Sequence, residues 1–279
     1  MVQQTSETSK GLLWEKMRKD LDTLCEQAKG VLGYSVLDLD SGDSASFNED
    51  VLMPTASTIK IAILFGLALR VHAGELEWET RVPLNSDEKV GGSGILGHLK
   101  HDVSLSVWDH ASLMISLSDN TATNICIRLA GMEFINKSLD ELGLKKTRIK
   151  RIMMDVEAAQ AGRENVSTAA ELLELVRRIE QRDGISEGVA KDVLSLLELP
   201  KGGAFQEGLP EGVRRANKPG GLGNLSVDAG IIYLSKKRFA LTTMGSFLEG
   251  KPSKWTADIV KTAYSYMALL NKCTDLGRS

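Results

Sequence analysis

The chain has 279 residues, of which 42% are hydrophobic and 25% charged, the composition of an ordinary soluble globular protein with ample length for a core. Its formal net charge of -3 excludes the basic footprint that binding to nucleic acid or to an anionic membrane surface requires. The three cysteines are far apart, odd in number and without Cys-x-x-Cys spacing, so we expect neither a disulfide framework nor a zinc site.

The first elements of the chain are predicted to be a helix and a hairpin. Residues 1–10 are polar and lack the apolar core of a secretory signal, so we expect a cytoplasmic chain as written, or a periplasmic or secreted one if a signal has been removed. An amphipathic helical pattern covers residues 11–29. Residues 31–39 then predict a strand, and turn residues at 40–43 lead to a second short strand that ends at Phe47.

The stretch 54–70 predicts a helix at the centre of a domain. Pro54 and Thr55 are helix start signals, and residues 61–70 form an apolar run without a polar face. A helix with this composition is one that protein surrounds on all sides.

The rest of the chain is predicted to be helical first and then strand-rich. Hydrophobic periodicity predicts helices at about 107–115, 121–129, 132–142, 168–181 and 187–197, then strands at 214–221, 228–234 and 238–244 before a closing helix. Strands at both ends around a helical middle predict an α/β (α+β) fold, in which one antiparallel sheet is built from both chain ends and flanked by the terminal helices. We expect a sheet lobe of residues 11–53 and 212–279 and an all-helical lobe of residues 54–211.

Ser57 and Lys60 lie three residues apart in the predicted first turn of the central helix, so their side chains share one face. A serine hydroxyl needs a neighbouring base to become a nucleophile, and a lysine becomes that base when burial and the positive helix end disfavour its ammonium form. The unpaired backbone N–H of Ser57 is a candidate donor to an oxyanion. A second Ser-x-x-Lys, at 86–89, has a loop composition and no buried helix behind it, so we expect no chemistry there.

Ser118-Asp119-Asn120 falls in the connection between two predicted helices. In a locally extended chain, Ser118 and Asn120 project to one side while Asp119 turns back to hold the loop. Ser118 would then relay a proton to a leaving nitrogen, and the Asn120 amide would hold a substrate carbonyl. The alternative is that Asp119 or Asn120 merely caps the helix starting at Thr121.

Lys218-Pro219-Gly220-Gly221 comes at the end of a predicted strand. Backbone N–H groups on a strand alternate between its two edges, and a proline inside a sheet is confined to a free edge, so the Gly221 N–H should be free to bind a substrate oxygen. Without side chains, Gly220 and Gly221 would let a ligand approach the backbone closely. Lys218 would attract an anionic substrate group, and the alternative is a plain turn with a solvated lysine.

Taken in order, these three motifs resemble those of the class A β-lactamases and the related penicillin-binding proteins, which are Ser-x-x-Lys, Ser-Asp-Asn and Lys-Thr/Ser-Gly. The likeness runs from about Gly33 to the closing helix and includes residues 92–96, 113–115, 118–124 and 228–232. It implies the β-lactamase-like fold and a serine hydrolase that needs no cofactor and no metal.

The resemblance also implies a role for each motif residue. Ser57 would be the acylated nucleophile and Lys60 its activating partner. Ser118 would shuttle a proton to the leaving nitrogen, while Asn120 would bind the substrate amide. Lys218 would engage the substrate carboxylate, and the N–H groups of Ser57 and Gly221 would form the oxyanion hole.

Two departures from the family pattern bear on activity. Pro219 stands where the family has a hydroxyl residue, so one hydrogen bond to a substrate carboxylate is lost, at a cost of about 1 kcal/mol or more. The class A enzymes also resemble one another in a Glu-x-x-Leu-Asn loop, whose glutamate activates the water that releases the acyl group, and residues 153–165 contain no such pattern. Glu157 is the best substitute, and an ordinary surface glutamate is the alternative.

The sequence therefore predicts a β-lactamase-type hydrolase that acts on a β-lactam or a related amide or ester through a Ser57 acyl-enzyme. We expect a small-molecule substrate, no nucleic acid or membrane partner, and a monomer. One alternative keeps the chemistry and changes the substrate, as in a D-alanyl-D-alanine peptidase, an esterase or an amidase with poor β-lactam turnover. The other is a non-hydrolytic sensor that is acylated once and stays so.

Overall fold

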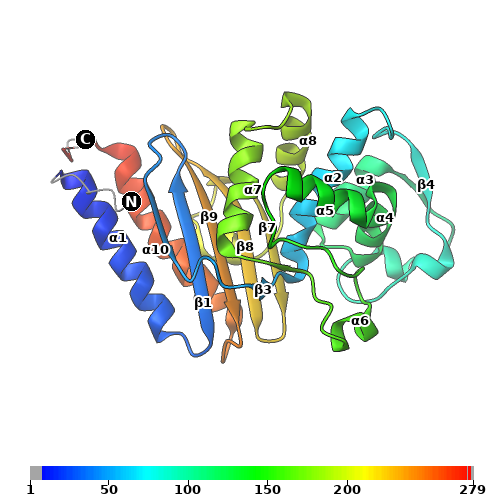
Figure 1. Cartoon of the computed structure of the whole chain (residues 1–279), viewed down its shortest axis with the longest axis horizontal. Coiled ribbons are helices and arrows are strands. Elements are labelled where there is room, and N and C mark those ends of the chain that lie inside the picture. The colour runs from blue at the N-terminus through cyan, green and yellow to red at the C-terminus, as the bar shows by residue number, and fades with distance from the viewer. Residues whose placement is uncertain (1–7, 275, 278–279) are drawn as a thin grey trace.

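A five-stranded antiparallel sheet lies at the centre of the fold in the computed structural model, which describes residues 8–274 and 276–277 (Figure 1). Its order is β2-β1-β9-β8-β7, so the first strands of the chain pair with the last and Val31 lies opposite Ser246. The strands of this sheet are β1 (Val31–Asp38), β2 (Ser44–Phe47), β7 (Arg214–Leu222), β8 (Leu225–Tyr233) and β9 (Arg238–Ser246). The predicted fold class, with one antiparallel sheet from both chain ends, is confirmed.

Helices and two short two-stranded ribbons make up the other regular elements of the described chain. One ribbon pairs β3 (Met53–Pro54) with β6 (Val166–Ser167), and the other pairs β4 (Arg81–Pro83) with β5 (Ser104–Ser106). The α-helices are α1 (Ser9–Gln27), α2 (Lys60–His72), α3 (Val107–Ser116), α4 (Asn120–Ala130), α5 (Met132–Glu141), α6 (Val156–Gln160), α7 (Ala169–Gln181), α8 (Glu187–Leu197), α9 (Ala204–Gly208) and α10 (Pro252–Lys272). Short 3-10 helices are η1 (Ala56–Ile59), η2 (Ser86–Glu88) and η3 (Leu96–His98).

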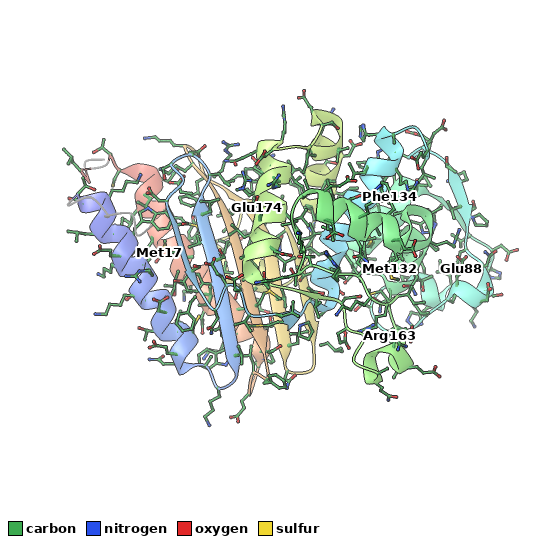
Figure 2. All side chains as sticks on the ribbon, viewed as in Figure 1. Met17, Glu88, Met132, Phe134, Arg163 and Glu174 are labelled. Carbon is green, nitrogen blue, oxygen red and sulfur yellow. The ribbon has the colours of Figure 1, made fainter. Side chains whose placement is uncertain are left out.

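The two faces of the sheet are covered by different helices. The terminal helices α1 and α10 cover one face, where α9 packs against α10, and α7 covers the other face, with α2 to α5 beyond it (Figure 1). Successive residues of β9 point to opposite faces of the sheet. Leu241 packs in the core under the terminal helices, while Ala240 packs in the core of the helical side. Met17 of α1 lies between that helix and the sheet and is fully buried (Figure 2).

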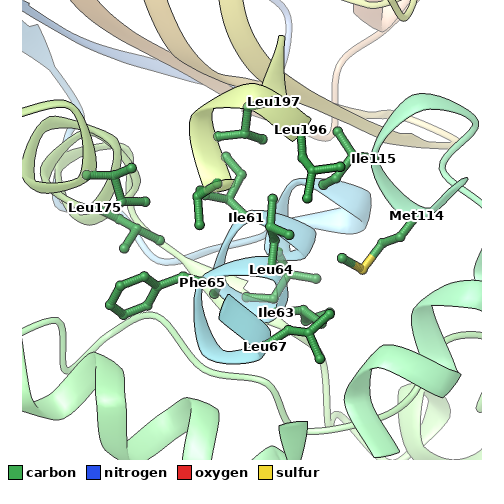
Figure 3. Close-up of a cluster of buried hydrophobic side chains, with 14 of the residues drawn as sticks. Ile61, Ile63, Leu64, Phe65, Leu67, Met114, Ile115, Leu175, Leu196 and Leu197 are labelled. Atoms are coloured by element: carbon green, nitrogen blue, oxygen red, sulfur yellow. The ribbon is translucent and has the colours of Figure 1, made fainter. Parts of the chain in front are cut away.

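Helix α2 occupies the centre of the helical side. Its residues from Lys60 to Ala68 are all buried, which agrees with the predicted lack of a polar face. Side chains from α3, α7 and α8 surround it, and Figure 3 shows Met114, Leu175 and Leu196 converging on its apolar residues. Among the described residues, no helix is both long and apolar enough to cross a membrane.

The start of the central helix differs from its prediction. Pro54 is part of strand β3, where it lies opposite Val166, and the helical segment begins at Ala56 as a 3-10 turn before α2 starts at Lys60. The helix start signals were misread because a two-residue strand is too short to produce an alternating pattern. Of residues 1–10, on which the expectation about localisation depends, residues 1–7 lie outside the described residues.

Candidate active site

The three motifs meet along one cleft of about 540 Å³ between η1, the start of α4 and the edge strand β7. Ser57, Ser118, Lys218, Gly220 and Gly221 all line it. A larger groove of about 970 Å³ lies beside α7 and α8, and none of the motif residues lines that one. The smaller cleft is therefore the candidate active site.

Ser57 is placed by the short strand that precedes it. Both the backbone N–H and the hydroxyl of Thr55 donate to the carbonyl oxygen of Asn165, at 3.0 and 3.1 Å. Ala56 then takes a φ of 43°, a left-handed conformation that is uncommon for a residue with a Cβ and that is frequent at functional sites. This sharp turn puts Ser57 in the first turn of η1, facing the cleft.

Lys60 is the fully buried first residue of α2 and is not among the residues that line the cleft. Its Nζ donates to the carbonyl oxygen of Ser118 at 2.7 Å, to the Ser118 hydroxyl at 3.0 Å and to Oδ1 of Asn120 at 3.2 Å. Burial lowers the pKa of Lys60 well below its usual value, and the nearby charge of Lys218 lowers it further. A neutral amine at this position keeps two of the three N–H contacts and has a lone pair with which to take a proton from a serine hydroxyl.

The Ser118 hydroxyl lies between two lysines. It accepts from Nζ of Lys60 at 3.0 Å and from Nζ of Lys218 at 3.2 Å. Ser118 has a φ of 54°, and this left-handed conformation turns its side chain out of the helix connection toward both amines. Because the hydroxyl oxygen accepts both of these bonds, its proton is free to be donated toward a substrate atom in the cleft. Burial lowers the pKa of Lys218 to about 7.

Asp119 fixes the loops around Ser118, as the sequence predicted. Its buried carboxylate accepts from the backbone N–H groups of Ile95 at 2.6 Å and Leu96 at 2.8 Å. It also caps α4 by accepting from the N–H of Ala122 at 2.9 Å. The two predictions for Asp119, a loop anchor and a helix cap, are thus compatible and both are observed.

Asn120 is brought to Lys60 but is not among the residues that line the cleft. Its Oδ1 accepts from Nζ of Lys60, and its Nδ2 donates to the carbonyl oxygen of Gly91 at 3.1 Å. In this arrangement Asn120 orients the base, and binding of a substrate amide requires its Nδ2 to leave Gly91.

Strand β7 carries the third motif at the end of the strand order, the position that the proline in the motif predicted. Gly221 is open, since a Cβ added there would meet Leu225 O at 3.5 Å. Gly220 differs from its prediction. A Cβ there would lie 2.6 Å from the carbonyl oxygen of Thr55 and 2.7 Å from the N–H nitrogen of Thr58, so the missing side chain makes room for the η1 backbone and not for a ligand.

This contact predicts the effect of substituting Gly220. A Gly220→Ala variant should lose about 1–3 kcal/mol in the free energy of unfolding, since η1 must move away from β7, and the acylation rate of Ser57 should fall with it. Urea denaturation of the variant measures the first effect. Gly221→Ala is the matched control, and equal stability losses in the two variants would contradict the role given to Gly220.

The loop of residues 151–165, which corresponds to the region of the absent Glu-x-x-Leu-Asn pattern, is tied closed at its base. Oδ1 of Asn165 accepts from the N–H of Lys150 at 2.8 Å, and its Nδ2 donates to the carbonyl oxygen of Arg151 at 3.1 Å. Asn124 of α4 holds the loop from the other side through both backbone groups of Met153. Since Asn165 also accepts from Thr55, the loop and the segment before Ser57 form one connected unit.

The acidic residues of this loop do not line the cleft. Asp155 caps α6 by accepting from the N–H of Ala158, and Glu164 pairs with Arg151 at 2.8 Å. Glu157 is exposed on α6 and, unlike Ser57 and Ser118, is not among the residues that line the cleft. Among the residues that line the described cleft, none is acidic.

Three residues of the site region were missed by the sequence reasoning. Asn165 closes the loop, Asp228 lies buried in β8 across from Pro219, and Lys201 lines the cleft from the connection between α8 and α9. Asp228 gave a usable signal, because a carboxylate inside an otherwise apolar strand has to be bound by specific partners. Lys201 and Asn165 are ordinary polar residues in loop sequence and gave none.

Comparisons with known proteins agree with this geometry. The profile of the family described as "Beta-lactamase enzyme family" matches residues 16–267. Beta-lactamase CARB-4 of Pseudomonas aeruginosa is 23% identical over 150 residues, which are 53% of this chain and 52% of that protein, and Beta-lactamase SME-1 of Serratia marcescens is 27% identical over 146 residues, or 52% and 49%. The aligned part of the chain thus spans about half the length of these curated relatives.

Solved structures match over nearly the whole chain. A beta-lactamase from Sphaerobacter thermophilus DSM 20745 has a TM-score of 0.83 and 26% identity, and covers 92% of this chain and 98% of its own. PBP-A has a TM-score of 0.82 and 25% identity, with coverages of 91% and 96%. A mutant of PBP-A, solved as an acyl-enzyme complex with penicillin G, has a TM-score of 0.81 and 25% identity, with coverages of 92% and 96%. On its sequence and its fold, the chain belongs to the beta-lactamase enzyme family.

Proposed function

We propose that the chain is a serine hydrolase of the β-lactamase type, which cleaves the amide bond of a β-lactam or a related amide or ester through an acyl-enzyme at Ser57. The observation that carries this proposal is the buried Lys60 at the Ser118 hydroxyl. A lysine that is buried and lies beside a second lysine is available as a neutral base, and a purely structural lysine does not require this.

Acylation follows from this arrangement in three proton transfers. The Lys60 amine takes the proton of the Ser57 hydroxyl as Oγ attacks the substrate carbonyl carbon, and the N–H groups of Ser57 and Gly221 receive the oxyanion. Ser118 then gives its hydroxyl proton to the leaving nitrogen as the carbon–nitrogen bond breaks, and the Lys60 ammonium returns a proton to Ser118. Attack of one water on the acyl ester would release the product and restore Ser57.

The substrate we propose carries a carboxylate near the scissile bond, as β-lactams do. Lys218 is the cation that would bind it, because its ammonium lies beside Ser118 in a cleft without acidic lining residues. The acyl-enzyme complex of a PBP-A mutant with penicillin G supports a β-lactam as acylating agent for a chain of this fold. Since every motif residue comes from one chain, we also infer that a monomer suffices.

A second candidate function is favoured by the 151–165 loop. The loop brings no carboxylate to the lining of the cleft, so a water that attacks the acyl group lacks an evident base. This feature fits an enzyme that β-lactams acylate and from which the acyl group is released slowly, such as a D-alanyl-D-alanine peptidase, an esterase or an amidase. It also fits a sensor that stays acylated.

Intact-mass spectrometry during incubation with a chromogenic cephalosporin tests both candidates. We expect a covalent adduct on the wild-type protein and none on Ser57→Ala. Sustained turnover with return to the free mass would identify a working β-lactamase, whereas one burst with a persistent adduct would identify the slowly deacylating alternative. If the wild-type protein shows neither adduct nor turnover with any β-lactam, peptide or ester, the proposed function is wrong.

The pH dependence of acylation should be bell-shaped for a substrate with a carboxylate. Lys60 acts as a base only when neutral, so the rate should rise as the pH passes through its lowered pKa. Lys218 binds an anion only when charged, and because its pKa is lowered to about 7, the rate should fall above that pH. With a neutral ester the falling limb should disappear, and stopped-flow measurement of the second-order rate constant from pH 5 to about pH 9 checks this difference. A falling limb that is the same for both substrates would contradict the assignment to Lys218.

A further inference from the structure

Lys201 is a charged side chain of the cleft that has no role in the chemistry described so far. Lys201 lies in the connection between α8 and α9 and lines the cleft together with Lys218. These two lysines are the charged members of the lining in the described part of the chain, and no acidic residue accompanies them. The end of the cleft at β7 is therefore electrostatically positive.

The ammonium of Lys201 has one N–H donor left for a ligand. Its Nζ donates to the carbonyl oxygen of Leu197 at 2.6 Å and also to that of Leu199, both at the C-terminal end of α8. An ammonium has three N–H donors, so two contacts leave one for a ligand. Burial lowers the pKa of Lys201 to about 8, while the carboxylate of Asp228 opposes that change. The group thus still carries its charge at pH 7.

Asp228 does not cancel the positive charge by direct pairing. Its Oδ1 accepts from Nδ2 of Asn217 at 2.8 Å, and its Oδ2 accepts from the N–H of Phe205 at 3.1 Å. Burial raises the pKa of Asp228 to about 6, so its carboxylate is only moderately acidic. In the described part of the chain neither Lys201 nor Lys218 forms an ion pair within 4.0 Å, so both remain available to an anion from outside.

Pro219 connects the two lysines. A Cβ placed on Gly203 would lie 2.4 Å from Cβ of Pro219, so the segment that begins with Lys201 packs directly on the proline ring. The residue that removes a hydroxyl donor from the third motif thus also packs against the segment that carries Lys201, two residues before Gly203. Replacing a neutral hydroxyl by an ammonium trades a neutral hydrogen bond for a charge-assisted one.

We propose that Lys201 is a second cation for the carboxylate of the substrate, which it binds together with Lys218 in place of the hydroxyl that Pro219 eliminates. This inference rests on the proposed function for the identity of the substrate. It makes Lys201 a determinant of specificity for anionic substrates over neutral ones of the same shape.

Binding measured in the Ser57→Ala background tests the inference separately from the chemistry. Benzylpenicillin and its methyl ester are titrated calorimetrically into Ser57→Ala and into Ser57→Ala/Lys201→Met. We expect the Lys201 substitution to raise the dissociation constant for benzylpenicillin about tenfold or more, because a charge-assisted contact is lost, and to leave that for the ester unchanged. Lys201→Arg should restore much of the difference, and the exposed Lys236→Met is the matched control for a change in net charge.

Other outcomes overturn the inference. If Lys201 only caps α8, Lys201→Met will lower thermal stability and weaken both ligands alike, or will weaken neither. Absence of binding by either ligand to Ser57→Ala also overturns it. Failure of the proposed function would give a different result. Benzylpenicillin would then not acylate the wild-type protein, while the two Ser57→Ala proteins, with and without Lys201→Met, would still differ tenfold in their dissociation constants.

Discussion

Replacing Lys60 by methionine is expected to slow acylation of Ser57 by about 10³-fold, because general bases of this kind contribute roughly 10²–10⁴ to a rate. Methionine keeps the length and the apolar stem of the side chain and removes the amine that contacts Ser118 and Asn120. The second-order rate constant for labelling by a fluorescent penicillin measures the effect. The loss should be largest above the pKa of Lys60 and smaller below it, because the protonated Lys60 of the wild-type protein is no base there either.

Two controls separate the loss of the base from damage to the site. Lys60→Arg keeps a donor to Ser118 but is never neutral, so it should be nearly as slow as Lys60→Met. Circular dichroism and urea denaturation should show both variants folded. A rate within tenfold of the wild-type value in either variant would mean that another group activates Ser57.

Replacing Asp119 by alanine is expected to give the largest loss of stability, about 3 kcal/mol in the free energy of unfolding. The buried carboxylate accepts from the N–H groups of Ile95, Leu96 and Ala122, and each of these donors would be left in the interior without a partner. The loop also packs tightly on this side chain, since a Cβ on Gly94 would lie 2.3 Å from Asp119 Cγ. Urea denaturation of the variant and of the wild-type protein measures this difference in the free energy of unfolding.

The same variant should lose acylation activity. Asp119 lies between Ser118 and Asn120, and movement of the loop would separate both from Lys60. Asp119→Asn is the informative control, because an amide oxygen can keep part of the contacts while its NH₂ group opposes an N–H donor. We expect it to fall between the wild-type protein and Asp119→Ala, and a stability of Asp119→Ala within 1 kcal/mol of wild type would refute the anchoring role.

The sequence was sufficient for those parts of the fold where one physical signal dominates. The apolar run after Lys60 predicted a buried helix because no amphipathic alternative fits it, and α2 is buried from Lys60 to Ala68. Pro219 predicted an edge strand because it has no N–H to give, and β7 is the last strand of the sheet order. In both cases the local chemistry admits only one tertiary environment.

Sequence reasoning was weaker where the outcome depends on contacts between distant segments. Pro54 looked like a helix start, but its partner Val166 is more than 100 residues away and makes it a strand residue. Gly220 has the composition of a ligand-binding turn, yet the space beside it is filled by η1. The direction in which Glu157 faces depends on how Asn124 and Asn165 hold its loop, which periodicity does not encode.

The pairing of β1 with β9 has a consequence for how the protein is made. Val31 meets Ser246 at the middle of the sheet, so the segments that must pair are separated by most of the chain. During synthesis the first hairpin and most of the helices leave the ribosome long before β9. The sheet therefore cannot be completed until nearly the last residues have been made. Folding that depends on such distant pairing is slow, and the hairpin β1–β2 exposes an unpaired, largely apolar edge until β9 arrives. The nascent chain should therefore depend on chaperones most strongly in the interval before residue 238 is released.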